Sequence, residues 1–490
     1  MKLSIKNWML AGALLLAAGA CTEDFEEINS NPNKPVEVDP QYLLPHAIQT
    51  AVDNYWGNKT RNERLNFDHA MSWVGYLTRN IYENEGDNYN VQPSVNITSW
   101  EVFYTDGLIN FEKIASFSSA ESERPNTNYE GIGLGMQAWT FSLLTDVWGA
   151  IPYSEALAGT AEEPVFSPAY DSQEAVYASV IEQLKIANEK LDPEGPAIAG
   201  DIMFGGDIMM WKKLFNSTRF KLLNRQAHIV ASSGAEMQAM LNDPATYPMI
   251  GSNDDIAQLK YGAVPTNNPW HDILIQQGRT DWNINSMLVS TLQDLGDPRL
   301  EVYASPGSLA EGVYSGHPSG LPGEIATTYL GYSAVINPDI FAQTTSPAVL
   351  MSYAELLFLK AEAALEGDIT GDAQAFFEMG VAAAFEQHGL TMPAGYLAQL
   401  GTATKETIMT QKWLALFGQG IEAWTELRRT GYPVMPAHDP RAQFQNDGVL
   451  PTRMEYPSTE YSLNGANVEA GASLNGGADN MKTPLWWVEQ

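Results

Sequence analysis

The sequence has little cysteine and little positive charge. It contains one cysteine, Cys21, and 27 Lys plus Arg residues against 59 Asp plus Glu residues. A single cysteine excludes an intramolecular disulfide framework and any multi-cysteine metal site. The net charge of −32 argues against a nucleic-acid partner, whose phosphates bind cations. It also argues against electrostatic adhesion to an anionic membrane. With 490 residues, 44% of them hydrophobic, the chain can nevertheless bury a large core.

The N-terminal segment predicts export rather than part of the fold. The apolar run Met9–Ala18 follows Lys2 and Lys6 and leads almost directly to Cys21. This run is too short to span a bilayer, which is typical of a secretory signal peptide at residues 1–20. A cysteine in this position resembles a bacterial lipobox, in which the thiol is acylated, although Ala18 stands where Leu is commonest. The alternative is a plain signal peptide followed by an incidental cysteine.

The residues after Cys21 predict a tether. Four acids follow within six positions, and Asn29–Pro40 carries three prolines and several asparagines. The acidic cluster resembles the export signal that sends lipoproteins of Bacteroidetes-type bacteria to the outer-membrane surface, and a merely solvated tether fits the same residues. In either case the lipid, rather than the protein surface, would anchor the chain. We expect a tether at 21–40 and a single domain at 41–490.

Helical periodicity dominates the remaining sequence, and no convincing run of alternating strand residues appears, although short hairpins fit the loop-rich parts. The expected helices cover residues 41–54, 61–80, 98–116, 130–146, 172–191, 209–231, 350–366, 371–387 and 404–430, with a short one at 284–295. Gly418 and Gly420 divide the last of the long helices. Two stretches, about 244–348 and 433–490, are rich in turn-forming residues and are expected to be irregular. Such long irregular segments usually have a function.

The expected helices at 350–366 and 371–387 form a pair across a short turn. Ala354 and Ala361 lie on one face of the first helix, where small side chains allow a partner to approach closely. The pair resembles a tetratricopeptide unit, and an ordinary helical hairpin fits the same residues. Stacked pairs of this kind build a curved α-solenoid. The predicted fold class is therefore all-α, with an irregular, loop-rich region for binding.

Motifs for catalysis, metals or cofactors are scarce. The sequence has no nucleophile elbow, P-loop or His-Glu-x-x-His pattern. Gly131, Gly133 and Gly135 have the wrong spacing for a dinucleotide loop and suit close helix packing instead. We therefore predict no catalytic residue, no metal site and no cofactor. A glycosidase needs only two opposed carboxylates, so that alternative stays open.

Aromatic residues interleaved with amides and charges in the irregular segments suggest a ligand-binding surface. Sugar rings present flat C–H faces to aromatic planes and hydroxyl groups to amides and carboxylates, and peptides suit this composition almost as well. The alternative is that these aromatics pin loops onto the helices. The two groups are Tyr82, Asp87, Asn88, Tyr89 and Trp100, and Tyr261, Asn267, Asn268, Trp270, Arg279 and Trp282. From them we select Tyr82, Asp87, Tyr89, Trp270, Arg279 and Trp282 as the candidate ligand-binding residues.

Several segments together resemble the SusD/RagB family of nutrient-binding outer-membrane lipoproteins. Besides the lipobox at Cys21, they are Thr145–Tyr153, Gln411–Phe417, Gly420–Trp424, Arg428–Pro433, Arg453–Pro457 with Glu460 and Asn464, and Pro484–Trp487. The C-terminal block is the most specific, and the similarity extends along essentially the whole chain. These motifs look structural: Trp148, Gly149 and Pro152 fit a tight turn, while Arg428 and Arg429 are expected to pair with acids or cap carbonyl groups.

The resemblance implies an all-α scaffold of tetratricopeptide-like helix pairs. It also implies a partner, a TonB-dependent SusC-type β-barrel transporter, over which the lipoprotein would sit as a hinged lid. The expected function is capture of an oligosaccharide at the cell surface and its delivery to that transporter, without catalysis. The alternatives are a peptide-binding, RagB-like lipoprotein, an all-α surface glycosidase, or a structural lid without affinity for a ligand. The family's ligand contacts vary, so the resemblance assigns no binding residue.

Overall fold

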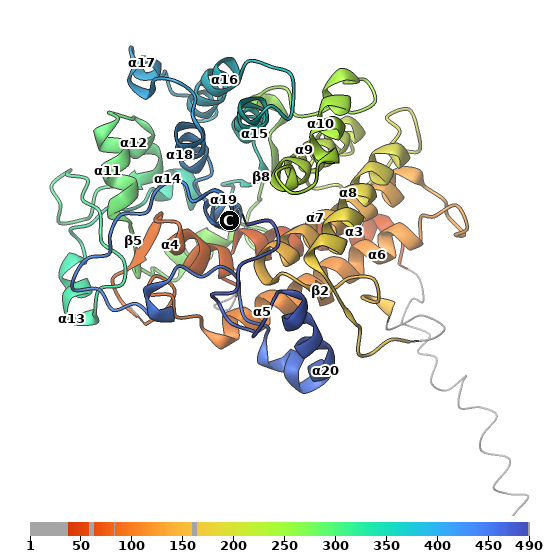
Figure 1. Ribbon diagram of the computed structural model, residues 1–490, viewed down its shortest axis with the longest axis horizontal. Helices are drawn as coiled ribbons and strands as arrows, with labels where there is room; N and C mark the ends of the chain where they lie inside the picture. The colour runs from red at the N-terminus through yellow and green to blue at the C-terminus, as the bar shows by residue number, and fades with distance from the viewer. Residues whose placement is uncertain (1–37, 58–62, 83, 159–163, 489–490) are drawn as a thin grey trace, which may run out of the picture. The chain divides into compact units, whose positions relative to one another are not determined.

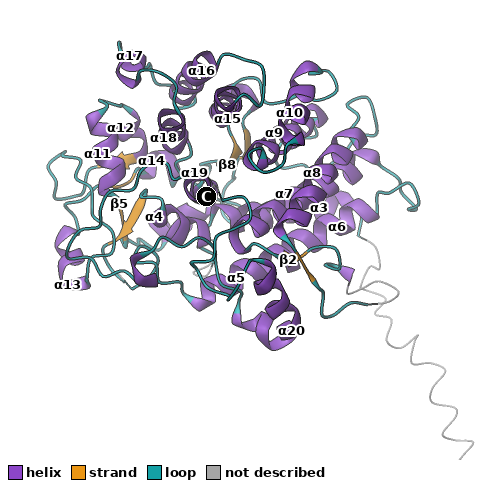
Figure 2. Cartoon of the chain, viewed as in Figure 1, coloured by secondary structure: helices purple, strands orange, loops and turns teal. Residues whose placement is uncertain are grey.

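Helices make up most of the chain, and the strands among them are short (Figure 2). The computed structural model describes residues 38–57, 63–82, 84–158 and 164–488. The predicted signal peptide, Cys21 and nearly all of the tether lie outside the described residues. Residues 40–490 form one compact unit. Among the described residues, no helix carries an apolar stretch long enough to cross a bilayer.

The predicted all-α fold of paired helices is confirmed, and most of the expected helices are present within a few residues. Adjacent helices pack as pairs, notably α7 with α8, α8 with α9 and α15 with α16. The long helices are α3 (Pro40–Trp56), α5 (Pro93–Val102), α6 (Ile109–Ser116), α7 (Thr127–Trp148), α8 (Gln173–Lys190), α9 (Ile208–Gln226), α10 (Ser232–Asn242), α15 (Tyr353–Glu366), α16 (Ala373–Glu386), α18 (Lys405–Ala415), α19 (Gly420–Thr430) and α20 (Ser458–Leu474). Most of them surround one large core of apolar and aromatic side chains, and a smaller second core lies among α15, α16 and α18.

Local sequence signals explain where these helices begin and end. Ser172 caps α8 by accepting a hydrogen bond from the backbone N–H of Ala175. The predicted break between α18 and α19 is confirmed. Gly418 lies there at φ +96°, a conformation that a side chain disfavours, and an added Cβ would come within 2.7 Å of Trp56.

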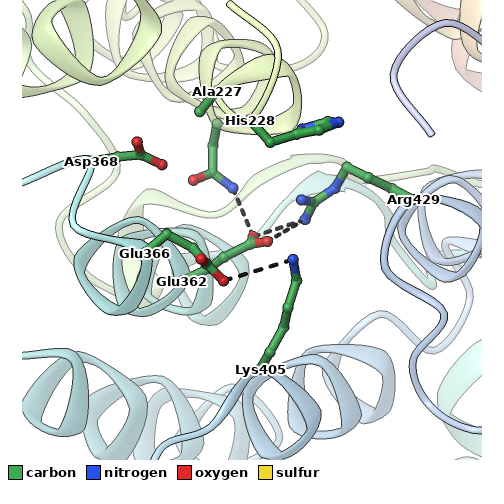
Figure 3. A pocket seen from close by; sticks show the side chains of 8 residues that line it. Ala227, His228, Glu362, Glu366, Asp368, Lys405 and Arg429 are labelled. Carbon is green, nitrogen blue, oxygen red and sulfur yellow. Dashed lines mark hydrogen bonds and ion pairs between the residues drawn. The ribbon is translucent and has the colours of Figure 1, made fainter. Parts of the chain in front are cut away.

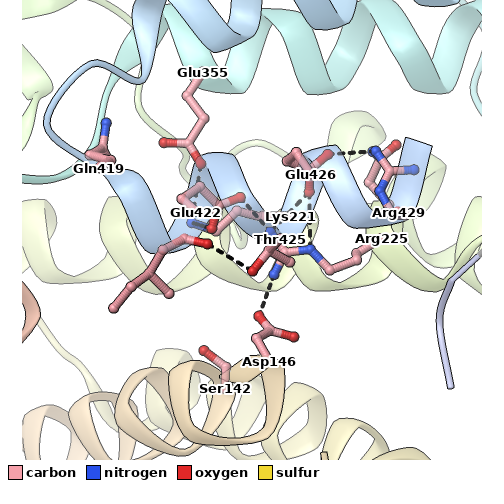
Figure 4. Close-up of polar contacts among 12 residues, drawn as sticks. Ser142, Asp146, Lys221, Arg225, Glu355, Gln419, Glu422, Thr425, Glu426 and Arg429 are labelled. Atoms are coloured by element: carbon pink, nitrogen blue, oxygen red, sulfur yellow. Dashed lines mark hydrogen bonds and ion pairs between the residues drawn. The ribbon is translucent and has the colours of Figure 1, made fainter. Parts of the chain in front are cut away.

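A buried network of charges joins α9, α7 and α19 (Figure 4). Arg225 of α9 pairs with Asp146 of α7 at 2.5 Å, with Glu426 of α19 at 3.0 Å, and with Glu422. Lys221 also pairs with Glu422, at 3.2 Å. Burial by itself would raise the pKa of Glu426, but the surrounding Arg and Lys side chains hold that pKa well below its usual value. The network ties three helices together.

The expected roles of Arg428 and Arg429 are confirmed. Arg429 pairs with Glu362 at 2.7 Å and with Glu426 at 2.6 Å. Arg428 donates hydrogen bonds to the carbonyl oxygens of Trp424, at 3.0 Å, and Thr452, at 2.8 Å. Both motif arginines therefore support the scaffold.

Within the described ranges, the strands form four antiparallel pairs between segments that are mostly distant in the sequence. The pairs are β1 (Leu77–Arg79) with β5 (Trp282–Ile284), β2 (Ile151–Pro152) with β3 (Tyr170–Asp171), β4 (Ala257–Leu259) with β8 (Ala348–Met351), and β6 (Ala304–Ser305) with β7 (Val335–Ile336). Three of the four pairs, β1 with β5, β4 with β8 and β6 with β7, include a strand from the stretch 244–348. That stretch also contains η4 (Asn253–Asp255), η5 (His271–Gln276), α11 (Ser286–Asp294), α12 (Arg299–Tyr303), α13 (Gly323–Ala326), η6 (Thr327–Tyr329) and α14 (Pro338–Phe341).

Two expectations need correction. The segment 61–80 is not one helix: it holds the π-helical turn η1 (Leu65–Ala70), the single turn α4 (Met71–Trp73) and then β1. Gly75, at φ +75°, ends the helical path, and β1 pairs with a strand about two hundred residues later. The tail 433–490 is not irregular throughout, because α20 occupies much of it. This helix buries few residues, so its apolar pattern is weak.

Candidate ligand-binding face

The pairing of β1 with β5 provides the platform of the candidate site. Arg79 lies opposite Trp282, and Thr78 lies opposite Asn283. The ladder continues past the strands, since the Asn80 N–H donates to the carbonyl of Asp281 at 3.0 Å. A third segment joins from the other side, where Asn283 Nδ2 donates to the Ser333 carbonyl at 3.3 Å. The loop that follows β1 and the residues that precede β5 are thereby held side by side.

Tyr82 is the exposed residue of this platform, and Arg279 beside it is partly exposed. Tyr82 is 50% exposed and has φ +60°. A bulky residue rarely adopts this conformation, and such strain is concentrated at functional sites. The Arg279 guanidinium carbon lies 5.6 Å from the ring centroid of Tyr82 and 5.6 Å from that of Trp282. Arg279 Nε donates to Asp281 Oδ2 at 3.0 Å, and this pairing raises the pKa of Arg279. The surface formed by Tyr82 and Arg279 is the candidate ligand-binding face, and it is called the ligand-binding face below.

A buried ionic cluster supports the face from below. Arg79 pairs with Asp68 at 3.2 Å, with Asp281 at 3.3 Å, and with Glu85. Its guanidinium lies 4.7 Å from the Trp282 ring centroid. Burial alone would raise the pKa of Asp68, but Arg79 and its neighbours hold it below the usual value. Asp281 therefore links the buried Arg79 to the accessible Arg279.

Asp87 and Tyr89 are buried residues that tie down the loop carrying Tyr82. Asp87 Oδ2 accepts hydrogen bonds from Thr78 Oγ1 at 2.7 Å and from the backbone N–H of Gly320 at 3.0 Å. Burial raises the pKa of Asp87 to about 6. Tyr89 has φ +66° and packs against Phe444 with ring centroids 4.6 Å apart. Both residues hold the loop in shape, and they expose 1% and 5% of their surface.

Trp270 and Trp282 lie within the core under the face, with 0% and 3% of their surface exposed. Trp270 stacks on Trp56 with ring centroids 5.0 Å apart. Phe67 contacts both, at 4.8 Å from Trp270 and 5.0 Å from Trp282. Trp282 Nε1 donates to Asp68 at 2.8 Å, which connects the aromatic layer to the ionic cluster. Of the six selected residues, the structure thus brings Tyr82, Arg279 and Trp282 together, and leaves Tyr82 and Arg279 accessible.

Asp281 and Tyr332 are not among the six residues selected from the sequence. Asp281 stands two residues after Arg279 and orients it by accepting a hydrogen bond. Opposite charges two residues apart in the sequence could have indicated this pair. Tyr332 is 55% exposed and precedes Ser333, whose carbonyl bonds to the platform. It lies within the stretch 244–348. The sequence offers one signal for it, which is an aromatic side chain in an irregular segment.

A separate cavity of about 410 Å³ lies among α9, α15, α18 and α19 (Figure 3). Its charges are largely paired: Glu362 binds Arg429 at 2.7 Å and Asn224 at 2.7 Å, and Glu366 lies 3.7 Å from Lys405. No Trp, Tyr or Phe is among its described lining residues. In the part of the chain that the structure describes, no group of three or more His, Cys or acidic side chains is placed to hold a metal ion. The cavity therefore lacks the stacking surface that the ligand-binding face offers.

Comparison with known proteins identifies the family to which the chain belongs. The family model SusD-like_2, described as starch-binding associating with outer membrane, matches residues 32–457. A solved structure of a chitin-binding protein is 26% identical, covers 92% of this chain and 100% of its own, and has a TM-score of 0.79. A SusD homolog from Bacteroides uniformis is 24% identical, with the same coverage and a TM-score of 0.77. A chitin-binding SusD homolog from Flavobacterium johnsoniae is 23% identical, covers 91% of this chain and 98% of its own, and has a TM-score of 0.78. None of the curated protein sequences compared with the chain matches it significantly.

Proposed function

Because the chain belongs to the SusD-like family of starch-binding proteins that associate with the outer membrane, we propose that it captures a nutrient oligosaccharide at the ligand-binding face. The observation that carries this proposal is the half-exposed ring of Tyr82, held at φ +60° beside Arg279. A polar loop that holds a strained aromatic residue in contact with solvent is arranged for a ligand rather than for stability. No bond of the ligand is made or broken.

Each part of the face has a role in recognition. The Tyr82 ring stacks on the C–H face of a sugar, and this contact supplies most of the affinity. The Arg279 guanidinium donates hydrogen bonds to ring or hydroxyl oxygens and is kept charged and oriented by Asp281. The buried platform keeps the face in one arrangement before binding, so that little entropy is lost when the ligand arrives.

We further propose that the bound saccharide passes to a SusC-type TonB-dependent barrel and that a lipid on Cys21 holds the protein at the outer-membrane surface. The family description, which includes association with the outer membrane, supports this location. The apolar run Met9–Ala18, which lies just before Cys21, supports the lipid. A protein tethered beside its transporter needs only modest affinity, because its effective concentration there is high.

Calorimetry on the purified mature protein tests the proposal. The panel should contain chitooligosaccharides and maltooligosaccharides, because two of the similar structures are of chitin-binding proteins and the family description names starch. Tyr82→Ala should weaken binding of the recognised saccharide by about tenfold or more, which corresponds to about 1.4 kcal/mol. Tyr42→Ala is the matched control, since Tyr42 is 70% exposed on α3 and should leave affinity unchanged. Equal affinity of the Tyr82→Ala and wild-type proteins would refute the assignment of the face.

The alternatives give different results in the same experiment. Heat from peptides, with none from any saccharide, would favour a peptide-binding protein of the RagB type. New reducing ends during incubation would indicate a glycosidase, and loss of that turnover in Asp368→Asn would locate it in the acidic cavity of Figure 3. No heat from any saccharide or peptide would leave only a structural lid.

A further inference from the structure

A second cavity, of about 350 Å³, lies between α5, η2 (Phe103–Leu108) and α20. In Figure 1, α20 lies against α5, close to the short strand β2. The cavity shares no residue with the ligand-binding face. Its volume is within the range of small-molecule sites, which is about 300–1,000 Å³. The cavity is called the α5–α20 pocket below.

The rim of the α5–α20 pocket is unusually apolar. Phe166 is 81% exposed and Leu463 is 74% exposed, which makes them the two most exposed large apolar side chains among the described residues. Both line this one cavity. Single exposed apolar residues are common on protein surfaces. Two highly exposed apolar side chains at the same cavity, however, indicate a binding surface.

The aromatic floor of the pocket is fixed before any ligand binds. Tyr104 donates from its hydroxyl to the Pro152 carbonyl at 2.8 Å, which holds its ring in place. Trp100 packs against Tyr104 with ring centroids 5.1 Å apart and against Trp148 at 5.2 Å. Rigid rings of this kind bind a flat ligand face at little entropic cost.

Hydrogen-bonding groups interrupt these rings. Glu460 lines the pocket and is held by a hydrogen bond from the Tyr170 hydroxyl to its Oε2 at 2.8 Å. Glu101 and Thr105 add a carboxylate and a hydroxyl group. Among the described residues of the lining, none is Lys or Arg, so the wall favours a ligand that donates hydrogen bonds and carries no negative charge. A purely apolar ligand would leave both carboxylates without new partners.

We propose that the α5–α20 pocket is a second saccharide-binding site, which takes one or two sugar rings of a neutral glycan. Phe166 and Tyr104 provide the stacking surface, and Glu101 and Glu460 accept hydrogen bonds from sugar hydroxyls. The choice of ligand class rests on the proposed function, whereas the location of the site does not. Two separate sites on one protein would hold a long glycan more tightly than a short one.

The test uses mature protein in which the first site is disabled by Tyr82→Ala and Arg279→Ala. Maltotriose and triacetylchitotriose serve as probes, and calorimetry at millimolar concentrations measures residual binding. Adding Phe166→Ala should weaken the residual binding by about tenfold. Because the Phe166 side chain is exposed, its loss should leave the fold intact. Leu463→Ala should also weaken binding, while Leu474→Ala, an exposed leucine on the same helix, should not.

The outcomes separate the two proposals. Residual binding that Phe166→Ala and Leu463→Ala remove supports the second site, even if Tyr82→Ala has no effect of its own. Complete loss of binding in the Tyr82→Ala, Arg279→Ala protein overturns the second site and leaves the first intact. Residual binding that neither Phe166→Ala nor Leu463→Ala changes also overturns it, as does a preference of the pocket for a detergent or fatty acid over both saccharides.

Discussion

The guanidinium of Arg279 lies 5.6 Å from the ring centroid of Tyr82, and Asp281 holds it in that place with a hydrogen bond of 3.0 Å. Asp281 also pairs with the buried Arg79. The accessible part of the face is thus connected to the core through one carboxylate. A partly exposed arginine would otherwise sample several rotamers, so this connection pre-orients the face.

Asp281→Asn should weaken saccharide binding several-fold. The substitution keeps the side-chain shape but removes the charge that orients Arg279 and partly neutralises Arg79. Unfolding in urea should show a loss of about 2 kcal/mol, because hydrogen bonds between charged groups contribute about that much. The neighbouring Thr280→Ala, at an exposed position, is the control for both measurements. Wild-type affinity in Asp281→Asn would mean that Arg279 has no part in binding.

Tyr82→Gly and Tyr82→Ala should differ in stability although both lose the ring. Both substitutions should abolish or greatly weaken binding. Glycine adopts φ +60° without steric cost, whereas alanine retains the strain of about 1 kcal/mol. Chemical denaturation should therefore find Tyr82→Gly more stable than Tyr82→Ala by about that amount. The reverse order would show that the loop relaxes out of this conformation when the ring is removed.

The contribution of Asp87 to the free energy of unfolding should fall as the pH rises from about 4 to about 6. Burial raises its pKa to about 6 in the folded state, against about 3.9 in an unfolded chain. The folded state therefore binds more protons than the unfolded state in this window. Its contribution is fully present below pH 4 and is lost as the pH rises through 6. The loss by pH 7 is about 3 kcal/mol, since one pKa unit corresponds to about 1.4 kcal/mol.

Comparison with Asp87→Asn isolates this contribution. Loss of solvent lowers the pKa of His69, His317 and His388 to about 4, so these residues add stability as the pH rises from 4 to 6.5. These opposing contributions are common to both proteins and cancel in the difference. Urea unfolding should show the advantage of wild type over Asp87→Asn shrinking between pH 4 and pH 7. A constant difference would mean that Asp87 is ionised throughout.

Arg225→Met should destabilise the protein by about 3–5 kcal/mol. It leaves the buried Asp146 without its cation and removes one of the cations beside Glu422 and Glu426. The thermal unfolding temperature should fall accordingly. Lys185→Met, which breaks only the exposed pair with Glu182, should cause no measurable change. A similar small effect for both variants would show that the network contributes nothing net to stability.

Cys21→Ser should release the protein from the membrane. The prediction follows from the sequence, since Cys21 lies outside the described residues. Mass spectrometry of the native N-terminal peptide should find an acylated cysteine, and the Cys21→Ser protein should leave the membrane fraction in cells that lack the partner barrel. A Cys21→Ser protein that stays with the outer membrane in those cells would contradict the lipid anchor.

Local signals in the sequence were sufficient for the helical scaffold. The cap at Ser172 and the apolar spacing behind it predict α8 at 172–191, and the structure has it at Gln173–Lys190. The break near Gly418 likewise follows from residues within one turn. By contrast, β1 exists because it pairs with β5, and no local pattern reports a partner so far along the chain. Likewise, α20 buries too few residues to show a periodic apolar face.

The candidate site was predictable as a region but not residue by residue. Tyr82 and Trp270 are both aromatic residues in irregular segments, and sequence alone treats them equally. The structure stacks Trp270 on Trp56 with none of its surface exposed, while half of Tyr82 remains accessible. Which aromatic faces solvent depends on how distant segments pack, and that information is not contained in composition or spacing.

The most direct test of the central claim is a crystal structure of the mature protein with its tightest-binding oligosaccharide. The account predicts an intact sugar ring packed on the face of Tyr82, with Arg279 in hydrogen-bonding contact with the ligand. An uncovered Tyr82 ring in a fully occupied complex, or a ligand cleaved by the protein, would contradict it.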